Sequence, residues 1–152
     1  MTGNSRGIDI GDIHHVAMVV ENLDQGMDLY AELFGLTWAN PWTGPIPILY
    51  KGESEEPIIS FTLSREGPPH IELIQSTLHE VWQPTAGLHH IGFWKSQIEP
   101  AVKSPLELGF AVEVMSPTGD FVYLRSQDGS RIEFVAASSQ PDFERWLEGG
   151  QL

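Results

Sequence analysis

Two short segments share one pattern of apolar and polar positions, residues 13–20 (IHHVAMVV) and residues 88–95 (LHHIGFWK). Each segment opens with an apolar residue and two histidines and continues as an apolar run. Its length and its β-branched and aromatic content are typical of a β-strand. The repeated motif therefore predicts two equivalent strands, each at the start of one half of the chain.

A segment with helical spacing follows the first of these strands. Its apolar positions recur every three or four residues, at Leu23, Met27, Tyr30 and Phe34. We expect Asn22 or Asp24 to cap the start of this helix and Gly35 to end it in a left-handed conformation. The corresponding segment of the second half, residues 96–110, places Gly109 like Gly35 but contains Pro105, which predicts a broken or kinked helix.

Three strand-like segments follow each predicted helix. Those of the first half are TWANPWT, PIISFTLS and PHIELIQS, and those of the second half are AVEVM, FVYLRS and RIEFVAA. We therefore expect a single domain over residues 1–152, with a first module at about 13–76, a linker at about 77–87 and a second module at about 88–137. A helical tail at about 141–148 presents apolar side chains that this domain or a second subunit must cover.

Alternation along the predicted strands selects four polar residues for one face of the sheet. The bulkier apolar residues suit the face under the helix, so the opposite face receives His15 and Glu72 from the first half. The second half contributes His90 and Glu133 in the same register. Each residue alone is more often structural, but their doubling indicates a mixed nitrogen and oxygen site, because buried carboxylates need compensation. We predict that the four bind one divalent ion, Ni, Co, Mn, Fe or Zn.

Composition limits the partners of the chain. The 152 residues carry a net charge of −13 and lack the clusters of Lys and Arg that bind nucleic acid. No apolar run is long enough to cross a membrane, and the first residues show no apolar signal core. The absence of cysteine excludes thiolate chemistry and fits the cytoplasmic location that we expect.

Four segments, IHHVAMVVENLDQGMDLYAELFGL, HIELIQ, GLHHIGFW and DGSRIEFV, resemble the vicinal oxygen chelate superfamily. That superfamily includes glyoxalase I, methylmalonyl-CoA epimerase, extradiol dioxygenases and bleomycin- or fosfomycin-resistance proteins. The resemblance runs from about residue 13 to 136 and implies an α+β fold, in which two βαβββ modules form a curled mixed sheet around a central cavity. It also implies the ligands His15, Glu72, His90 and Glu133. The epimerase branch is most similar, but its acidic base after FGL has no counterpart here before Glu53.

The resemblance implies an isomerase, epimerase or lyase of the glyoxalase type. Such an enzyme acts on a small hydrophobic, carbonyl-containing substrate through a metal-stabilised enolate. The catalytic base is then Glu72 or Glu133, and the residues do not choose between them. The alternatives are a metal-free binding or resistance protein and an iron-dependent dioxygenase. We expect a homodimer, whose modules pair within one chain or between chains.

Aromatic and apolar residues of the predicted strands are the candidates for the walls of the cavity, and together they indicate a hydrophobic substrate. The predicted lining comprises Trp42, Tyr50, Phe61, Trp94, Met115, Phe121 and Tyr123. His14 and His89 are interpreted as strand-end residues or as supports of the ligands. Arg125 is a candidate for binding a substrate anion, although a surface salt bridge is the favoured interpretation.

Overall fold

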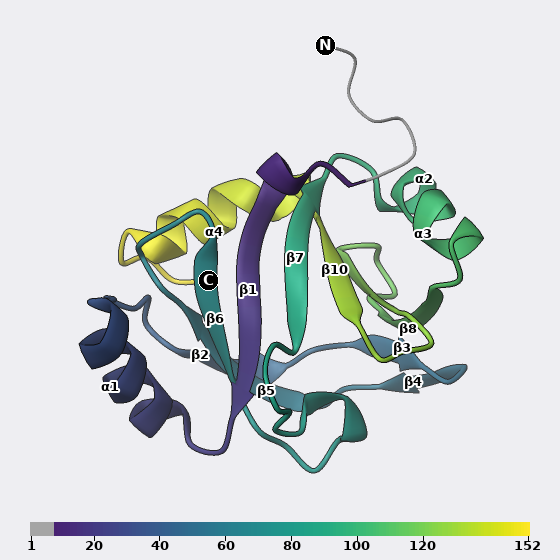
Figure 1. The fold of residues 1–152 in the computed structure, drawn as a ribbon. Coiled ribbons are helices and arrows are strands. Elements are labelled where there is room, and N and C mark those ends of the chain that lie inside the picture. The colour runs from purple at the N-terminus through teal and green to yellow at the C-terminus, as the bar shows by residue number, and fades with distance from the viewer. Residues whose placement is uncertain (1–7) are drawn as a thin grey trace.

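A single mixed sheet dominates the computed structural model, which describes residues 8–152 (Figure 1). Within this range the sheet has ten strands in the order β2-β5-β6-β1-β7-β10-β9-β8-β3-β4. The fold is α+β, as predicted. Most of the N-terminal stretch, in which the sequence shows no signal core, lies outside the described residues.

The elements have the following bounds. The strands are β1 (Ile13–Val20), β2 (Trp42–Pro45), β3 (Ile48–Tyr50), β4 (Glu53–Glu55), β5 (Ile58–Leu63), β6 (His70–Gln75), β7 (His90–Lys95), β8 (Ala111–Met115), β9 (Phe121–Arg125) and β10 (Arg131–Ala136). The helices are α1 (Leu23–Phe34), α2 (Ile98–Ala101), α3 (Lys103–Glu107) and α4 (Gln140–Leu147), with short 3₁₀ turns η1 (Ile10–Asp12), η2 (Glu80–Trp82) and η3 (Ala137–Ser139).

The two repeated strands pair with each other in the middle of the sheet. β1 runs antiparallel to β7, and each is parallel to the last strand of its own half, β1 to β6 and β7 to β10. The two modules are thus joined within one chain. The sheet curls so that one of its faces lines a cavity.

The first half holds a hairpin that the sequence pattern did not predict. β3 and β4 are joined by a turn at Lys51 and Gly52, whose φ angles are 51° and 78°. The hairpin leaves its own half and pairs with β8 at the far edge of the sheet. The strand predicted in TWANPWT is correspondingly shorter, because only β2 from Trp42 onward and an isolated bridge at Trp38 pair with neighbours.

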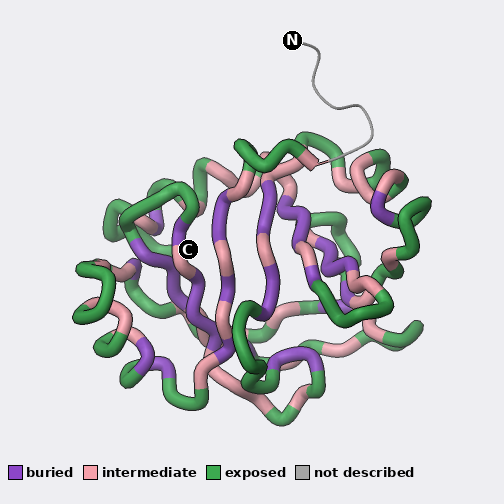
Figure 2. Tube along the Cα trace, viewed as in Figure 1, coloured by how far each residue is buried: buried purple, intermediate pink, exposed green. Residues whose placement is uncertain are grey.

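Strand alternation sorts the core into two layers, and Figure 2 shows the central strands as largely buried. The cavity side gathers Ala17, Val19 and Ile74 with the aromatic residues of the linker and β9. The outer side packs Phe93 and Phe134 under α2. Both faces agree with the assignment made from the sequence.

The two helical segments differ as their sequences predict. Asn22 caps α1 by accepting from the backbone N–H of Gln25 at 2.9 Å, and Gly35 ends it with a φ of 70°. The second segment breaks into α2 and α3 at Val102. Pro105 has no N–H for the carbonyl of Ala101, which explains the break.

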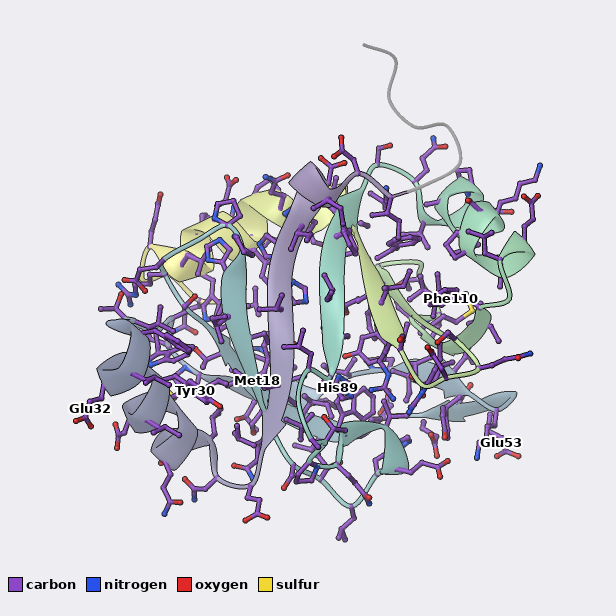
Figure 3. The ribbon with its side chains drawn as sticks, in the orientation of Figure 1. Met18, Tyr30, Glu32, Glu53, His89 and Phe110 are labelled. Carbon is purple, nitrogen blue, oxygen red and sulfur yellow. The ribbon has the colours of Figure 1, made fainter. Side chains whose placement is uncertain are left out.

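The tail forms α4, and its apolar face is covered by its own domain. Trp146 is 1% exposed, packs with Ala39 and Leu63, and donates its Nε1–H to the carbonyl of Asn40 at 2.7 Å. None of the described helices is long and apolar enough to cross a bilayer. Acidic side chains such as Glu32 on α1 and Glu53 on β4 point outward at opposite edges (Figure 3).

Candidate metal centre

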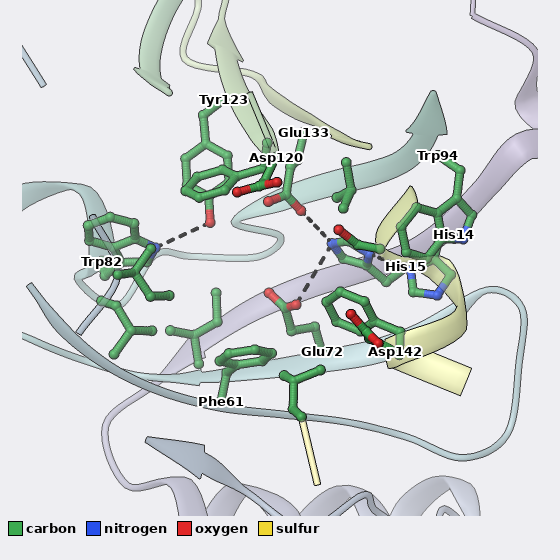
Figure 4. A pocket seen from close by; sticks show the side chains of 18 residues that line it. His14, His15, Phe61, Glu72, Trp82, Trp94, Asp120, Tyr123, Glu133 and Asp142 are labelled. Carbon is green, nitrogen blue, oxygen red and sulfur yellow. Dashed lines mark hydrogen bonds and ion pairs between the residues drawn. The ribbon is translucent and has the colours of Figure 1, made fainter. Parts of the chain in front are cut away.

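Three side chains from three strands converge at the inner face of the sheet. Figure 4 shows two of them, His15 and Glu133, with Glu72 nearby. His15 comes from β1, His90 from β7 and Glu133 from β10, and their ligand atoms lie within 4.8 Å of one another. The Nε2 atoms of the two histidines are 3.0 Å apart. Glu133 Oε1 lies 2.9 Å from Nε2 of His15 and 3.3 Å from Nε2 of His90.

The fourth predicted ligand stands beside this cluster without joining it. The Glu72 carboxylate on β6 lies 3.9 Å from Nε2 of His15 and 3.7 Å from Nε2 of His90. The three-residue cluster therefore comprises only His15, His90 and Glu133. The sequence pattern treated the two glutamates alike, but the structure does not.

Strand register explains the difference between the two glutamates. His15 and Glu133 flank Gly92 across three adjacent strands, and the Cβ of an alanine at this glycine would lie 2.1 Å from Cε1 of His15. His90 and Glu72 flank Ala17 in the same way. A methyl group thus occupies the row at Ala17 and is absent from the row at Gly92. The histidine and carboxylate that share a row are 2.9 Å apart at Gly92 but 3.7 Å apart at Ala17.

The balance between burial and neighbouring charges shifts the pKa values of the two carboxyls in opposite directions. Burial raises the pKa of the Glu72 carboxyl, and the adjacent histidines do not reverse this effect. Burial also acts on Glu133, but the adjacent His90 and His15 lower its pKa to about 2. Burial opposes the charge on His15, yet Glu72 and Glu133 raise the pKa of its imidazole. Glu133 is thus held as the anion, whereas the pKa of the Glu72 carboxyl lies above its ordinary value.

The first histidine of each repeated pair contacts the second. Nδ1 of His14 lies 2.9 Å from Nδ1 of His15, and Nδ1 of His89 lies 2.8 Å from Nδ1 of His90. A register shift between Ile13 and His15 places the His14 ring on the cavity side, although strict alternation predicts the outer face. Burial, followed by the charge of the adjacent His15 or His90, lowers the pKa of both His14 and His89 to about 3.

The cluster lies at a cavity of about 350 Å³. Four of the predicted lining residues border it, namely Phe61, Trp94, Phe121 and Tyr123. Residues that the sequence analysis did not propose complete the wall, among them Trp82 from the linker, Asp120 from the turn before β9, and Asp142 and Phe143 from α4. The tail helix and the linker therefore belong to the site, and no short motif marks them as such.

The other three predicted lining residues do not border this cavity. Trp42 is half-buried against Phe61, next to the tail helix. Tyr50 turns to the linker and donates its hydroxyl to Glu80, because the β3–β4 hairpin has crossed to the far edge. Met115 is 37% exposed near the end of β8. Arg125 does not border the cavity and pairs with Glu113 at 2.8 Å.

The chemistry of the converging atoms fits a divalent metal ion. Two imidazole nitrogens and one carboxylate oxygen form a mixed set that suits Zn, Fe, Mn, Co or Ni and leaves positions for other oxygens. The Nδ1 atom of each imidazole is turned back to another histidine, so its Nε2 is the nitrogen that faces the cluster. Such support of the far ring nitrogen is typical of metal-bound histidine.

Comparison with known proteins identifies the family. A sequence model of the Glyoxalase/Bleomycin resistance protein/Dioxygenase superfamily matches residues 14–121, and the chain belongs to this superfamily. A search of curated protein sequences finds no match.

Solved structures share the fold. A methylmalonyl-CoA epimerase variant from Streptomyces coelicolor, in complex with 2-nitronate-propionyl-CoA, is similar with a TM-score of 0.54 and 13% identity, over 83% of this chain and 98% of that chain. A hypothetical protein from Bacillus halodurans is similar with a TM-score of 0.54 and 21% identity, over 82% of this chain and 92% of that chain. At these identities the likeness concerns the fold alone.

Proposed function

We propose that this protein is a divalent-metal-dependent enzyme that transfers a proton next to a carbonyl group of a small apolar substrate. The observation that carries the proposal is the convergence of His15, His90 and Glu133 beside an aromatic cavity. These three residues would hold the ion. When bound, a divalent ion supplies Lewis-acid stabilisation of negative charge on substrate oxygens.

Glu72 is the residue that we assign as the general base. Its carboxylate faces the same cavity but lies outside the tight cluster, at 3.7 Å or more from the histidine nitrogens. Burial raises its pKa, which brings a carboxylate closer to the range useful for proton transfer near neutral pH. Glu133, whose pKa is held at about 2, suits a permanently ionised ligand instead.

The cavity supports a small substrate. Its volume of about 350 Å³ lies at the lower end of the range for small-molecule sites. Phe61, Phe121 and Tyr123 present apolar or aromatic surface toward it. We therefore expect a compact cyclic or aromatic compound with two neighbouring oxygens.

Solvent exchange at carbon tests this function with simple carbonyl compounds in place of the natural substrate. The protein, loaded in turn with Zn, Mn, Co, Ni or Fe, is incubated in D₂O with small α-hydroxy ketones and 2-oxo acids, and loss of the α-proton is followed by NMR. We expect metal-dependent exchange that Glu72→Gln slows by about 10² to 10⁴-fold. Absence of exchange with every metal and every compound would remove the proposal.

The same ligands support a second candidate. Two histidines and one carboxylate form the set used by non-haem iron oxygenases, which His15, His90 and Glu133 match in type. An iron-loaded protein that consumes O₂ with a catechol, and shows no carbon exchange with the other metals, would favour this function. A metal-free binding protein is the third candidate and predicts no metal uptake at all.

The homodimer and the cytoplasmic location expected from the sequence stay predictions. Light scattering coupled to gel filtration measures the number of chains per particle directly. Because β1 and β7 already pair within one chain, we expect a dimer to form without exchange of modules.

A further inference from the structure

We propose that His14 and His89 are positioning residues that fix the tautomer of the ligand histidine following each of them, His15 and His90. The proposal rests on the proposed metal site and deepens it. Its observation is the repeated Nδ1 to Nδ1 contact, at 2.9 Å in the first pair and 2.8 Å in the second. In such a contact one nitrogen must carry the proton and the other must accept it.

The second pair has a defined direction because a carbonyl lies at its far end. Nε2 of His89 is 2.6 Å from the carbonyl oxygen of Val81, and a carbonyl only accepts. Nε2 of His89 therefore carries the proton. In the neutral ring Nδ1 is then the acceptor, so Nδ1 of His90 donates. The lone pair of His90 is left on Nε2, the atom that faces His15 and Glu133.

The backbone around His89 holds this arrangement in place. The N–H of His89 donates to the carbonyl of Ala17 at 2.7 Å, and its own carbonyl accepts from Nη1 of Arg131 at 3.2 Å. Arg131 is itself held by Glu113 at 2.6 Å. His89 is 2% exposed, so water does not compete for its ring.

The first pair repeats the arrangement by another route. His14 is 8% exposed and packs against Trp94 and His70, with ring centroids 4.6 Å and 5.0 Å away. When its Nδ1 accepts from Nδ1 of His15, Nε2 of His15 is again the nitrogen that faces the cluster. The doubled histidines of the two segments thus have one explanation, in which the second residue of each pair binds and the first residue orients it.

The tautomer can be read in the metal-free protein. Long-range ¹H–¹⁵N NMR distinguishes a protonated Nδ1 from a protonated Nε2 in each neutral imidazole. At pH 8 we expect His90 to carry its proton on Nδ1 in the wild type and to populate both tautomers in His89→Leu. A wild-type His90 with its proton on Nε2 would overturn the proposal, whether or not metal binds.

Metal affinity gives the second readout. We expect His14→Leu and His89→Leu to weaken Zn²⁺ binding by about 10 to 100-fold in competition with a chelator. His89→Asn, whose side-chain oxygen can accept near the position of Nδ1, should recover part of the loss. The matched control is His70→Leu. His70 is buried, and its Nδ1 lies 2.7 Å from the carbonyl oxygen of Ser64 rather than beside His15 or His90. This variant should bind Zn²⁺ as tightly as the wild type does. Wild-type affinity in both leucine variants would refute the positioning role, whereas failure of the wild type to bind Zn²⁺ would refute the metal site.

The charge of the cavity lining leads us to infer, independently, that the substrate carries no anionic group beyond its chelating oxygens. Four carboxylates border the cavity, Glu72, Asp120, Glu133 and Asp142, and the described lining includes no lysine or arginine. The nearby basic side chains are engaged, because Arg125 and Arg131 pair with Glu113, and Arg145 pairs with Asp142. Arg145 offsets the charge of Asp142, so three carboxylates remain, and a bound divalent ion would offset two of these charges and leave the lining acidic.

A matched pair of chelators tests this inference. Kojic acid is uncharged outside its two chelating oxygens, and in comenic acid a carboxylate replaces its hydroxymethyl group. We expect the Zn²⁺-loaded protein to bind kojic acid at least about tenfold more tightly, after correction for the affinity of each probe for free Zn²⁺. Asp120→Asn should narrow the difference. Equal or tighter binding of comenic acid would overturn the inference, and binding of neither probe would overturn the proposed function with it.

Discussion

The two halves of this protein contain the same sequence motifs but contribute differently to one site. The second half supplies His90 and Glu133, with 3.3 Å between Nε2 and Oε1, while in the first half 3.9 Å separates Nε2 of His15 from Oε2 of Glu72. The histidine closest to Glu133 is His15, from the opposite half, at 2.9 Å. An internal repeat therefore supplies matched residues in unequal positions, and we propose that Glu133 binds the metal while Glu72 transfers the proton.

The largest expected effect separates the two carboxylates. Glu133→Gln removes an ionised oxygen from the cluster, and we expect metal binding to fall by at least about 100-fold. Glu72→Gln should keep the ion within a few-fold and lose proton exchange by about 10² to 10⁴-fold. Metal titration and deuterium exchange on both variants measure the two effects. Equal loss of metal in both variants would show that the glutamates act as equivalent ligands.

Substitutions at Gly92 and Ala17 test why the Glu133 and Glu72 carboxylates lie at different distances from the histidines. Gly92→Ala places a methyl group against the His15 ring, so we expect a loss of about 2 to 3 kcal/mol in the free energy of unfolding and weaker metal binding. Ala17→Gly, the mirror change, should cost only about 1 kcal/mol. Urea denaturation of the metal-free proteins provides the comparison. A Gly92→Ala protein as stable as the wild type would disprove the role of the missing methyl group at Gly92.

The pH dependence of stability sharpens the comparison of the two histidine pairs. In the folded metal-free protein the pKa of His14 and of His89 is about 3, against 6.5 for an unperturbed histidine. Below pH 6.5 these histidines bind a proton in the unfolded chain but stay neutral in the folded protein. Each ring therefore lowers the free energy of unfolding as the pH falls. Between pH 6.5 and 5 the loss is about 1.6 kcal/mol per ring.

Substitution isolates this contribution from those of other groups. We expect His14→Asn and His89→Asn each to lose about 1.6 kcal/mol less than the wild type over the same interval, as measured by urea denaturation at both pH values. A wild type and variants with the same pH response would contradict the burial of neutral rings.

The smallest effect concerns the glycines that end the helical segments. Gly35 and Gly109 have φ angles of 70° and 97°, which a side chain disfavours. Alanine at either position should lower the free energy of unfolding by about 1 kcal/mol, although one ends an intact helix and the other a broken one. Gly11→Ala, at a glycine without positive φ, is the control and should change little. Thermal unfolding resolves the difference.

Much of the architecture could be predicted because it depends on local patterns in the sequence. The repeated strands, the capped helix at Leu23–Phe34, the break before Pro105 and the inward face of His15 and Glu133 all follow from spacing and turn chemistry. These features depend on residues within one or two turns or strands of one another. The family resemblance then added the curl of the sheet.

Other features depend on contacts between distant segments and left no local signal. The hairpin β3–β4 pairs with β8, so that the four strands of the second module separate it from β1. Its strand Glu53–Glu55 is polar and short. Tyr50 lies on this hairpin and therefore outside the cavity lining, whereas Trp82 of the linker and Phe143 of the tail border the cavity. The unequal positions of the two glutamates depend on register at Gly92 and Ala17, which alternation alone does not reveal.

Metal content of the purified protein tests the central claim most directly. The chain is loaded with Zn, Mn, Co, Ni or Fe, freed of excess ion and analysed for bound metal, beside His90→Ala and Glu72→Gln. The account predicts about one ion per chain in the wild type and in Glu72→Gln, and none in His90→Ala. A wild type that retains no metal under any of these conditions, or a His90→Ala variant that retains as much as the wild type, would contradict it.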